Sequence, residues 1–254
     1  MVRQGGVRTW LFLRGWAREA RHWGDFPEQF RAAMPDAQVV ALDLPGNGRF
    51  CKRCSPLAVE AMVEQARAWL GEQGTPPPYH LLGLSLGGVV SIDWASRHPD
   101  EVAACVVLNT SLRPFSAFYE RIRPRNYATL LCVLSERDPG ARETAIFRLT
   151  SSRELEPDVV SAWTRYATER PVSRGNALRQ LVAAARYRAP AGPPRVPVLV
   201  LAGAGDRLVD PRCSESLARR WNVPLAVHRN AGHDLTLDDG PWVAAEVKRW
   251  LRPS

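Results

Sequence analysis

The sequence predicts an α/β protein with a mainly parallel sheet of about six strands flanked by helices. Short apolar runs rich in valine, leucine and isoleucine recur at residues 7–13, 38–42, 79–84, 102–108, 196–202 and 225–228. Most of these runs are continuous rather than alternating, as expected for strands that are buried on both faces of a parallel sheet. Segments with helical spacing lie between the runs, and strands that alternate with helices form a doubly wound sheet.

The helices are predicted from apolar residues that repeat with a period of 3.6. The clearest case is residues 58–70, where Val59, Met62, Ala66 and Leu70 fall on one helical face. Similar segments are residues 26–34, 86–97, 211–221 and 242–251. Only six residues precede the first apolar run, so no N-terminal β-hairpin is expected ahead of the sheet.

The alternation breaks between the fourth and fifth apolar runs. Residues 112–194 form a connection that is far too long for one crossover, and they contain helical patterns at 127–134, 141–149, 158–168 and 174–186. The connection ends in the breaker-rich sequence A-P-A-G-P-P at 189–194. We therefore expect an α/β core formed by residues 1–111 and 195–254, and a helical cap formed by residues 112–194.

Composition and charge exclude several classes of protein. The 254 residues are 45% hydrophobic and 24% charged, which is typical of a globular chain. No uncharged apolar stretch reaches 18 residues and no cleavable signal peptide is visible, so we expect a cytoplasmic protein without a membrane span. The net charge of +8 is spread along the chain without a nucleic-acid-binding module. It indicates either a solvated basic surface or an acidic partner or substrate.

Five cysteines do not suggest a disulfide framework, because their number is odd and no signal peptide is visible. Cys51 and Cys54 have CxxC spacing, but they lie in a loop and no second CxxC completes a zinc site. A redox or metal role for this pair is disfavoured.

The strongest motif is G-L-S-L-G at residues 83–87, which follows the apolar run 79–84 and precedes the helical segment 86–97. A G-x-S-x-G sequence between a strand and a helix is typical of a nucleophile elbow, in which a strained turn exposes the serine. Side chains at Gly83 and Gly87 would collide with this turn. Ser85 is therefore the predicted nucleophile; a glycine-rich turn with an idle serine is the alternative.

A serine needs a base and the base needs an acid. Of the histidines, only His233 lies in a loop after the last predicted strand, and Asp206 follows the fifth strand. Ser85, Asp206 and His233 then follow one another in the order expected of this motif. His80 and His228 lie within predicted strands, and His98 lies at a helix end; His22 is the remaining histidine. Asp138, Asp210 and Asp234 compete with Asp206 for the role of the acid. Asp210 resembles a helix N-cap, and Asp234 is adjacent to His233 and is expected to point elsewhere.

Two backbone amides are predicted to stabilise the oxyanion. Leu86 begins the helix after Ser85, and Gly15 permits a turn after the first strand that leaves the Trp16 N–H free. We expect the N–H groups of Trp16 and Leu86 to form the oxyanion hole.

With these motifs in this order, the chain resembles the α/β-hydrolase superfamily over nearly its whole length. Residues 14–16 correspond to that superfamily's His-Gly-x oxyanion segment, and D-L-P-G-N-G at 43–48 corresponds to its D-x-P-G-x-G loop. Within it, the chain is similar to small carboxylesterases of the pimeloyl-ACP methyl ester esterase type, which also have a tryptophan at the oxyanion position and a helical cap. Arg14 departs from the pattern because it replaces the usual histidine.

The residues and the resemblance together imply cleavage of a carboxylic ester through an acyl-enzyme, without a metal or organic cofactor. A thioesterase or a C–C bond hydrolase uses the same triad, so both remain alternatives, as does a non-catalytic binding protein of the same fold. The substrate is expected to be a small ester. Arginines early in residues 112–194 suggest that it is acidic or borne on an acyl carrier protein, with a general arginine bias as the alternative.

Candidate substrate contacts are Arg14, Trp23, Phe115 and Phe118. For each aromatic residue taken singly, core packing is the favoured interpretation.

Overall fold

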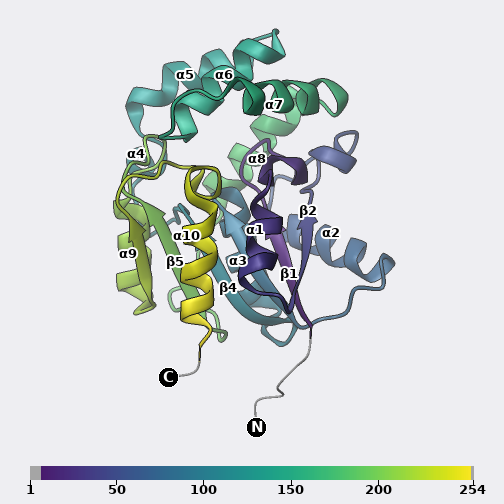
Figure 1. Cartoon of the computed structure of the whole chain (residues 1–254), viewed down its shortest axis with the longest axis vertical. Coiled ribbons are helices and arrows are strands. Elements are labelled where there is room, and N and C mark those ends of the chain that lie inside the picture. Colours follow the sequence, from purple (N-terminus) through teal and green to yellow (C-terminus); the bar gives the residue numbers. More distant parts are fainter. Residues whose placement is uncertain (1–6, 253–254) are drawn as a thin grey trace.

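A parallel sheet forms the centre of the molecule (Figure 1), and it has six strands. The computed structural model describes residues 7–252, and the strands are β1 (Arg8–Leu13), β2 (Ala37–Leu42), β3 (Tyr79–Leu84), β4 (Val102–Leu108), β5 (Val198–Gly203) and β6 (Leu225–His228). All neighbouring strands are parallel, in the order β2-β1-β3-β4-β5-β6. The predicted parallel sheet is thereby confirmed. The expected absence of a leading hairpin concerns residues 1–6, which lie outside the described residues.

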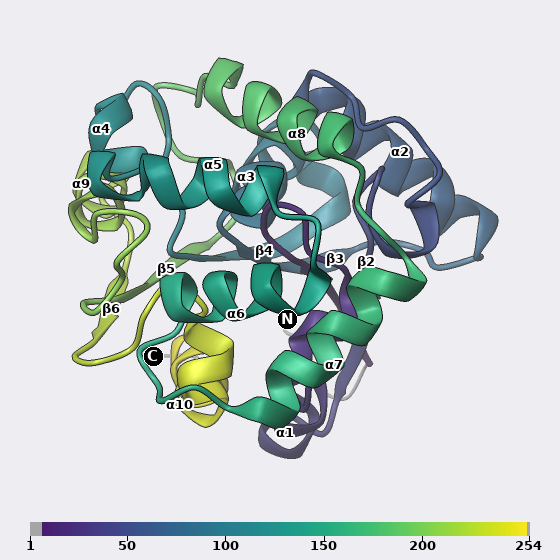
Figure 2. The same ribbon diagram turned by 90° about the horizontal axis from the view of Figure 1, so that it is seen from above.

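Both faces of the sheet are covered by helices, which explains why the strand sequences are continuously apolar. Helices α1 (Phe26–Ala33) and α10 (Leu235–Trp250) pack on one face (Figures 1 and 2). Helices α2 (Val59–Glu72), α3 (Leu86–Arg97) and α9 (Arg212–Trp221) pack on the other. Side chains of β1 alternate between these two cores: Phe12 packs with α1 and α10, and Leu11 packs with α2 and α3.

The order of the strands creates a crevice at one point of the sheet. After β1 the chain moves outward to β2, whereas after β3 it moves in the opposite direction to β4. The loops that follow β1 and β3 therefore diverge, although these strands are neighbours. Open α/β sheets bind ligands at such a switch point, beyond the carboxyl ends of the strands. The turn at Gly15 and the elbow at Ser85 both lie there.

Five α-helices occupy the connection between β4 and β5. They are α4 (Phe118–Arg121), α5 (Tyr127–Ser135), α6 (Pro139–Thr150), α7 (Pro157–Glu169) and α8 (Arg174–Arg186), which we call the inserted helices. The helices expected in this stretch from its periodicity are confirmed. Figures 1 and 2 show α5, α6 and α7 above the carboxyl ends of the strands.

The helices of the sheet layer are moderately long and carry charged residues. The longest, α10, has 16 residues, and α2 has 14. Across residues 7–252, no helix combines the length and the apolar character that crossing a membrane requires.

Candidate active site

Ser85 occupies a strained turn between β3 and α3. Its backbone angles are φ 55° and ψ −114°, in a region that residues with a side chain rarely adopt. A Cβ atom on Gly87 would lie 2.0 Å from the Leu13 carbonyl oxygen, and one on Gly83 would lie 2.4 Å from the Gly87 carbonyl oxygen. The glycines of the motif are therefore required because the elbow packs directly against the end of β1.

His233 and Asp206 form a buried hydrogen-bonded pair. The Nδ1 atom of His233 lies 2.7 Å from Oδ2 of Asp206, and the two residues are only 4% and 2% exposed. The second carboxylate oxygen of Asp206 accepts hydrogen bonds from the main-chain N–H groups of Leu208 and Val209, at 2.8 and 2.9 Å. These contacts fix the carboxylate, which in turn orients the imidazole.

Asn109 holds the loop that carries His233, and sequence reasoning missed this residue. It follows β4, is 2% exposed, and donates from Nδ2 to the carbonyl oxygens of Gly232 and His233, at 2.9 and 2.8 Å. Its Oδ1 accepts from the N–H of Gly203 at the end of β5, at 2.9 Å. The available signal was a polar residue at the carboxyl end of a buried strand, where a side chain can reach the neighbouring loops.

The predicted oxyanion donors lie on either side of Ser85. Leu86 is the first residue of α3, where the helix dipole favours negative charge. Trp16 follows Gly15, whose position would put a Cβ atom 3.3 Å from the Cβ of Ser85. In the part of the chain from 7 to 252, neither main-chain N–H donates to another protein group, so both are available to an oxyanion.

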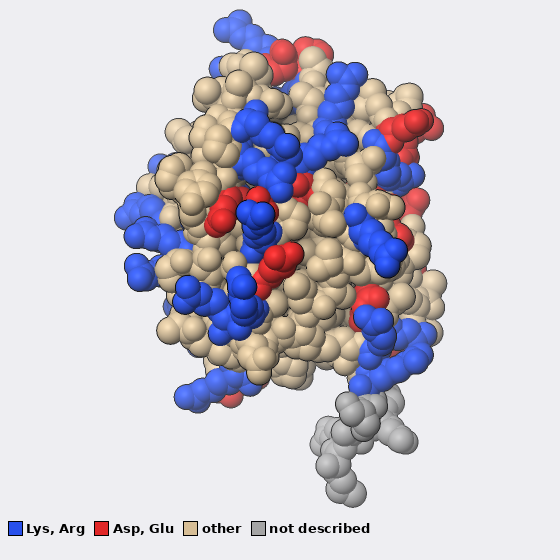
Figure 3. Space-filling model, turned by 90° about the vertical axis from the view of Figure 1, so that its left-hand side faces the viewer, with Lys and Arg blue, Asp and Glu red and all other residues tan. Residues whose placement is uncertain are grey.

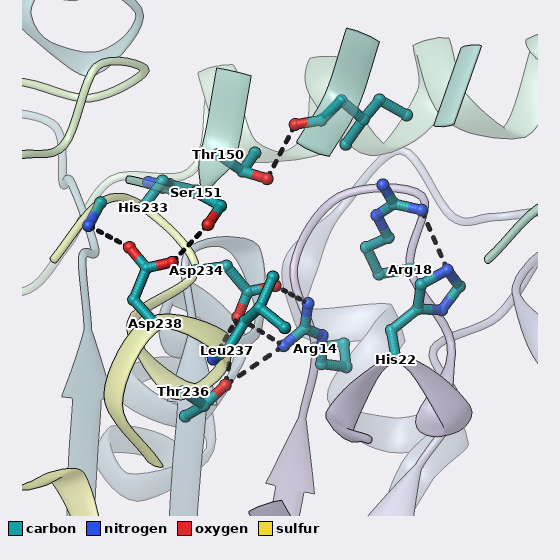
Figure 4. Close-up of polar contacts among 12 residues, drawn as sticks. Arg14, Arg18, His22, Thr150, Ser151, His233, Asp234, Thr236, Leu237 and Asp238 are labelled. Carbon is teal, nitrogen blue, oxygen red and sulfur yellow. Dashed lines mark hydrogen bonds and ion pairs between the residues drawn. The ribbon is translucent and has the colours of Figure 1, made fainter. Parts of the chain in front are cut away.

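Arg14 and Asp234 form a buried ion pair beside the loop that carries His233 (Figure 4). The guanidinium contacts both carboxylate oxygens, with Nη1 at 3.1 Å from Oδ1 and Nη2 at 2.5 Å from Oδ2. It also lies over the Trp23 ring, 4.7 Å from its centroid. Burial raises the pKa of Asp234, but the Arg14 charge and the hydrogen bonds outweigh it and hold the pKa below its usual value. The pair joins the segment before Trp16 to the residue after His233.

The competing residues have structural partners. Asp138 caps α6 by accepting from the Ala141 N–H, and Asp210 accepts from the Arg212 N–H at the start of α9. His98 contacts Glu64 and His228 contacts Asp239, with nitrogen–oxygen distances of 2.9 and 3.1 Å. Burial lowers the pKa of His80 to about 4. None of these residues lines a cavity that contains Ser85.

Two cavities meet at Ser85, and both are lined by Trp16, Ser85, Leu130 and Leu208. The first, of about 120 Å³, also contains His233, and we call it the charged arm. Its charged and polar lining includes Arg18, His22, Arg142, Glu143, Arg170 and Arg174. The second, of about 330 Å³, is lined mainly by apolar side chains, and we call it the apolar arm. Its lining includes Leu86, Val89, Phe118, Ile122, Tyr127 and Leu181, together with Arg121 and Gln180.

The predicted substrate contacts fall in different places. Phe118 lines the apolar arm and is 75% exposed, and Arg14 lines the charged arm although Asp234 occupies its guanidinium. Trp23 is 3% exposed because it packs against Phe12 and Phe26 in the core, so it does not reach either arm. Phe115 likewise packs edge-on against Trp221, with ring centroids 5.5 Å apart, and lines neither arm.

The cysteines carry no cross-link or metal cluster in the structure of residues 7–252. Cys51 and Cys54 are free thiols in the turn after β2, Cys51 partly and Cys54 fully exposed.

The comparisons with known proteins agree with this fold. A model of the alpha/beta hydrolase family matches residues 10–246, and the chain belongs to this family. It is similar to a pimeloyl-[acyl-carrier protein] methyl ester esterase of Aromatoleum aromaticum, with 28% identity over 235 residues, which cover 88% of this chain and 90% of that protein.

Two further similarities are shorter or more distant. A stretch of 103 residues is 33% identical to the biotin biosynthesis bifunctional protein BioHC of Teredinibacter turnerae. It covers 40% of this chain but only 17% of that protein, so the chain spans less than a fifth of this relative. Among solved structures, a thermophilic esterase from Thermogutta terrifontis has a TM-score of 0.72 at 22% identity, over 98% of this chain and 90% of that one. At this identity the likeness concerns the fold.

Proposed function

We propose that the chain is a serine hydrolase that cleaves carboxylic esters through an acyl-enzyme. The observation that carries the proposal is the combination of a serine in a strained elbow with a buried His233–Asp206 pair whose histidine lines the same cavity. The similarity to a methyl ester esterase supports the choice of esters among the hydrolases.

In the proposed mechanism Ser85 Oγ attacks the ester carbonyl while His233 takes its proton. The main-chain N–H groups of Trp16 and Leu86 stabilise the oxyanion, and Asp206 stabilises the imidazolium. His233 then gives the proton to the leaving oxygen, the alcohol departs, and Ser85 remains acylated. A water molecule, deprotonated by His233, attacks the acyl-enzyme and releases the acid, which restores the serine.

The direct test is hydrolysis of p-nitrophenyl esters with acyl chains from two to twelve carbons. We expect turnover by the wild type and a loss on the order of 10⁴–10⁶ in kcat for Ser85→Ala. Asp206→Asn should lose about 10³–10⁴ in kcat. Asp210→Asn, its control, should retain activity because in the described chain Asp210 contacts only Arg212 and Arg123 through its side chain and does not line either cavity at Ser85. Equal activity of wild type and Ser85→Ala would reject the proposal.

The same triad can process other acyl compounds, so thioesters and vinylogous diketones belong in the panel as alternatives. A non-catalytic binding protein is the remaining alternative. The exchange of histidine for Arg14 was its only support, and the ion pair with Asp234 now gives Arg14 a structural role. An inactive wild type in all panels would favour the binding protein.

We further propose that the inserted helices act as a substrate cap and that the natural ester is acidic or borne on an acyl carrier protein in the cytoplasm. The named relative acts on such an ester, and the chain has a net charge of +8. Figure 3 shows cationic side chains spread over the face that contains α4 and α9. Arg125 and Arg212 are exposed or partly exposed there, around a shallow groove.

Ionic strength tests this partner. Turnover of an ester borne on an acyl carrier protein should fall steeply as salt rises, because salt screens contacts between surface charges. Turnover of a neutral short ester should not change, and Arg125→Glu should weaken only the carrier substrate. The same salt response for both substrates would exclude the carrier protein.

A further inference from the structure

The two arms that meet at Ser85 differ in chemistry, and this difference has a consequence for the substrate. An ester has two halves, and a site with two unlike arms can bind one half in each. Which half lies in which arm follows only if the protein hydrolyses esters as proposed above.

The charged arm has an excess of positive charge. Five arginines line it, namely Arg14, Arg18, Arg142, Arg170 and Arg174, against the three acids Glu19, Glu143 and Asp234. Each acid already contacts an arginine: Asp234 binds Arg14, Glu143 binds Arg18, and Glu19 binds Arg21. In the described chain no carboxylate pairs with Arg170 or Arg174. The arm therefore has an excess of positive charge, and its unpaired part is carried by the exposed residues Arg170 and Arg174.

Arg18 is the buried centre of this arm. Its side chain is 9% exposed and its guanidinium lies over the Trp163 ring, 4.5 Å from the centroid. Nη1 lies 2.5 Å from Glu143 and 2.9 Å from Nε2 of His22, as Figure 4 shows for the histidine. Nη2 is buried and has no hydrogen-bond partner in the described residues. A buried N–H without a partner is costly, so an oxygen ligand at this position would be stabilising.

The positive charges of the arm also affect the pKa of His22. Burial, together with the charges of Arg18 and Arg14, holds the pKa of His22 well below its usual value. The imidazole is therefore neutral at neutral pH, and its Nε2 can accept the hydrogen bond from Arg18. A neutral histidine leaves the charge of the arm to the arginines.

The location of His233 assigns the halves of the ester to the arms. The base that accepts the serine proton must hand it to the leaving oxygen, so the leaving group has to lie on the side of His233. His233 lines the charged arm and does not line the apolar arm. The acyl chain then lies in the apolar arm, against Leu86, Val89 and Ile122. Among the described residues, the one charged side chain of this lining is Arg121, which donates from Nη2 to the Ala184 carbonyl oxygen at 2.7 Å.

We propose that the charged arm binds an anionic group on the leaving half of the substrate, through Arg18 and the arginines around it. The preferred substrate is thus an ester of an apolar acyl group with an alcohol that carries a carboxylate or a similar oxyanion. Charge-assisted bonds from a guanidinium to such an oxyanion are among the strongest that a protein makes.

Matched esters test this proposal. The first pair is meta-carboxyphenyl and meta-carbamoylphenyl hexanoate, which differ only in the charge of the leaving half. The second pair is monophenyl adipate and phenyl adipamate, which carry the same difference on the acyl half. Each kcat/KM is divided by the rate constant of alkaline hydrolysis of the same ester, which removes differences in intrinsic reactivity.

The wild type should prefer the carboxyphenyl ester to its amide by about tenfold, and should show no such preference within the adipate pair. Arg18→Met should bring the ratio of the two corrected kcat/KM values close to one. Arg31→Gln removes the same charge at an exposed position of α1 and should leave the ratio unchanged. Arg142 is a partly exposed residue of the same lining, and Arg142→Gln should reduce the preference. This variant replaces Arg18→Met in the test if Arg18→Met does not fold.

Absence of a preference within the first pair, or a preference within the adipate pair, would overturn the proposal while ester hydrolysis stands. A preference that survives both Arg18→Met and Arg142→Gln would also overturn it. Failure of the neutral esters in the wild type would instead reject the proposed function.

Discussion

Arg14 and Asp234 show how a single pair of residues can connect two loops of a reaction centre. The pair joins positions 220 apart in the chain, one beside the predicted oxyanion amide of Trp16 and the other beside His233. Asp234 also caps α10 through the Leu237 N–H, so the same carboxylate fixes the start of a helix. The usual histidine at position 14 is thus replaced by a cation with its own buried partner.

Removing one member of this pair should lower the stability of the protein more than removing both. Arg14→Met leaves the Asp234 charge buried without a counter-ion, and we expect a loss of about 3–5 kcal/mol in the free energy of unfolding. The double variant Arg14→Met, Asp234→Asn should recover a large part of this loss. Denaturant unfolding of both variants and the wild type measures it; equal stabilities of the single and double variants would show that the pair is not coupled.

At the scale of elements, the elbow depends on the contact between β1 and α3. The G-L-S-L-G motif correctly predicted both the turn and the steric role of its glycines, because these follow from local geometry. The strands were also predictable, since burial on both faces leaves an apolar run in the sequence. The hydrogen bonds from Asn109 to the His233 loop could not be predicted, because they join residues that are 123 and 124 positions apart in the chain. A sequence pattern records that a residue is polar, but not which distant loop it contacts.

Two glycine-to-alanine variants distinguish the effect of this contact on stability from the effect of helix propensity. Gly87→Ala should destabilise the protein and lower activity, because the new methyl group meets the main chain of Leu13. Gly71→Ala in α2 meets nothing within 4 Å and should stabilise by up to about 1 kcal/mol. Thermal unfolding distinguishes them, and a neutral Gly87→Ala would show that β1 can move away from the elbow at little cost.

Asp93 in α3 gives the protein a pH dependence. Burial, reinforced by the nearby Glu60, raises the pKa of Asp93 to about 6 from its ordinary 3.8, although Arg97 opposes the shift. The unfolded chain therefore releases this proton at lower pH than the folded protein does, and stability is lost as the pH rises from about 4 to about 6.

Asp93→Asn should remove that loss. Relative to the wild type, the variant should gain about 1–2 kcal/mol in the free energy of unfolding between pH 4 and pH 8. Asp100→Asn, which removes an exposed carboxylate, is the control. Denaturant unfolding at both pH values gives the comparison, and a pH-independent difference would mean that the burial of Asp93 is not responsible.

At the scale of the whole molecule, hydrogen bonds connect the inserted helix α8 to the turn at Trp16 and Ala17, which is predicted to bind the oxyanion. Gln180 of α8 is fully buried; its Oε1 accepts from the Ala17 N–H at 2.9 Å, and its Nε2 donates to Asn47 and Ser55 at 2.7 and 3.1 Å. The Trp16 indole donates to the Ala177 carbonyl oxygen of the same helix, at 2.7 Å. The sequence predicted the inserted helices by their periodicity, but it contained no sign of this connection to the turn.

Gln180→Leu should therefore affect stability and catalysis together. The variant leaves the Ala17 N–H, Asn47 Oδ1 and Ser55 Oγ without this partner, and we expect a loss of about 2–3 kcal/mol in the free energy of unfolding. It should also lower kcat for neutral esters because the Ala17 turn loses its anchor. Gln73→Leu, at an exposed position after α2, is the matched control. Loss of stability with unchanged kcat would confine the role of Gln180 to packing.

Covalent labelling with a fluorophosphonate, followed by mass spectrometry of the peptides, decides whether Ser85 is an activated nucleophile. Reaction of the phosphorus centre requires a deprotonated serine and an oxyanion site, so it reports the assembled machinery without knowledge of the natural substrate. We expect a single adduct on the peptide that contains Ser85, and no adduct on Ser85→Ala. An unlabelled wild type, or equal labelling of wild type and Ser85→Ala, would show that the elbow serine is not the nucleophile of this protein.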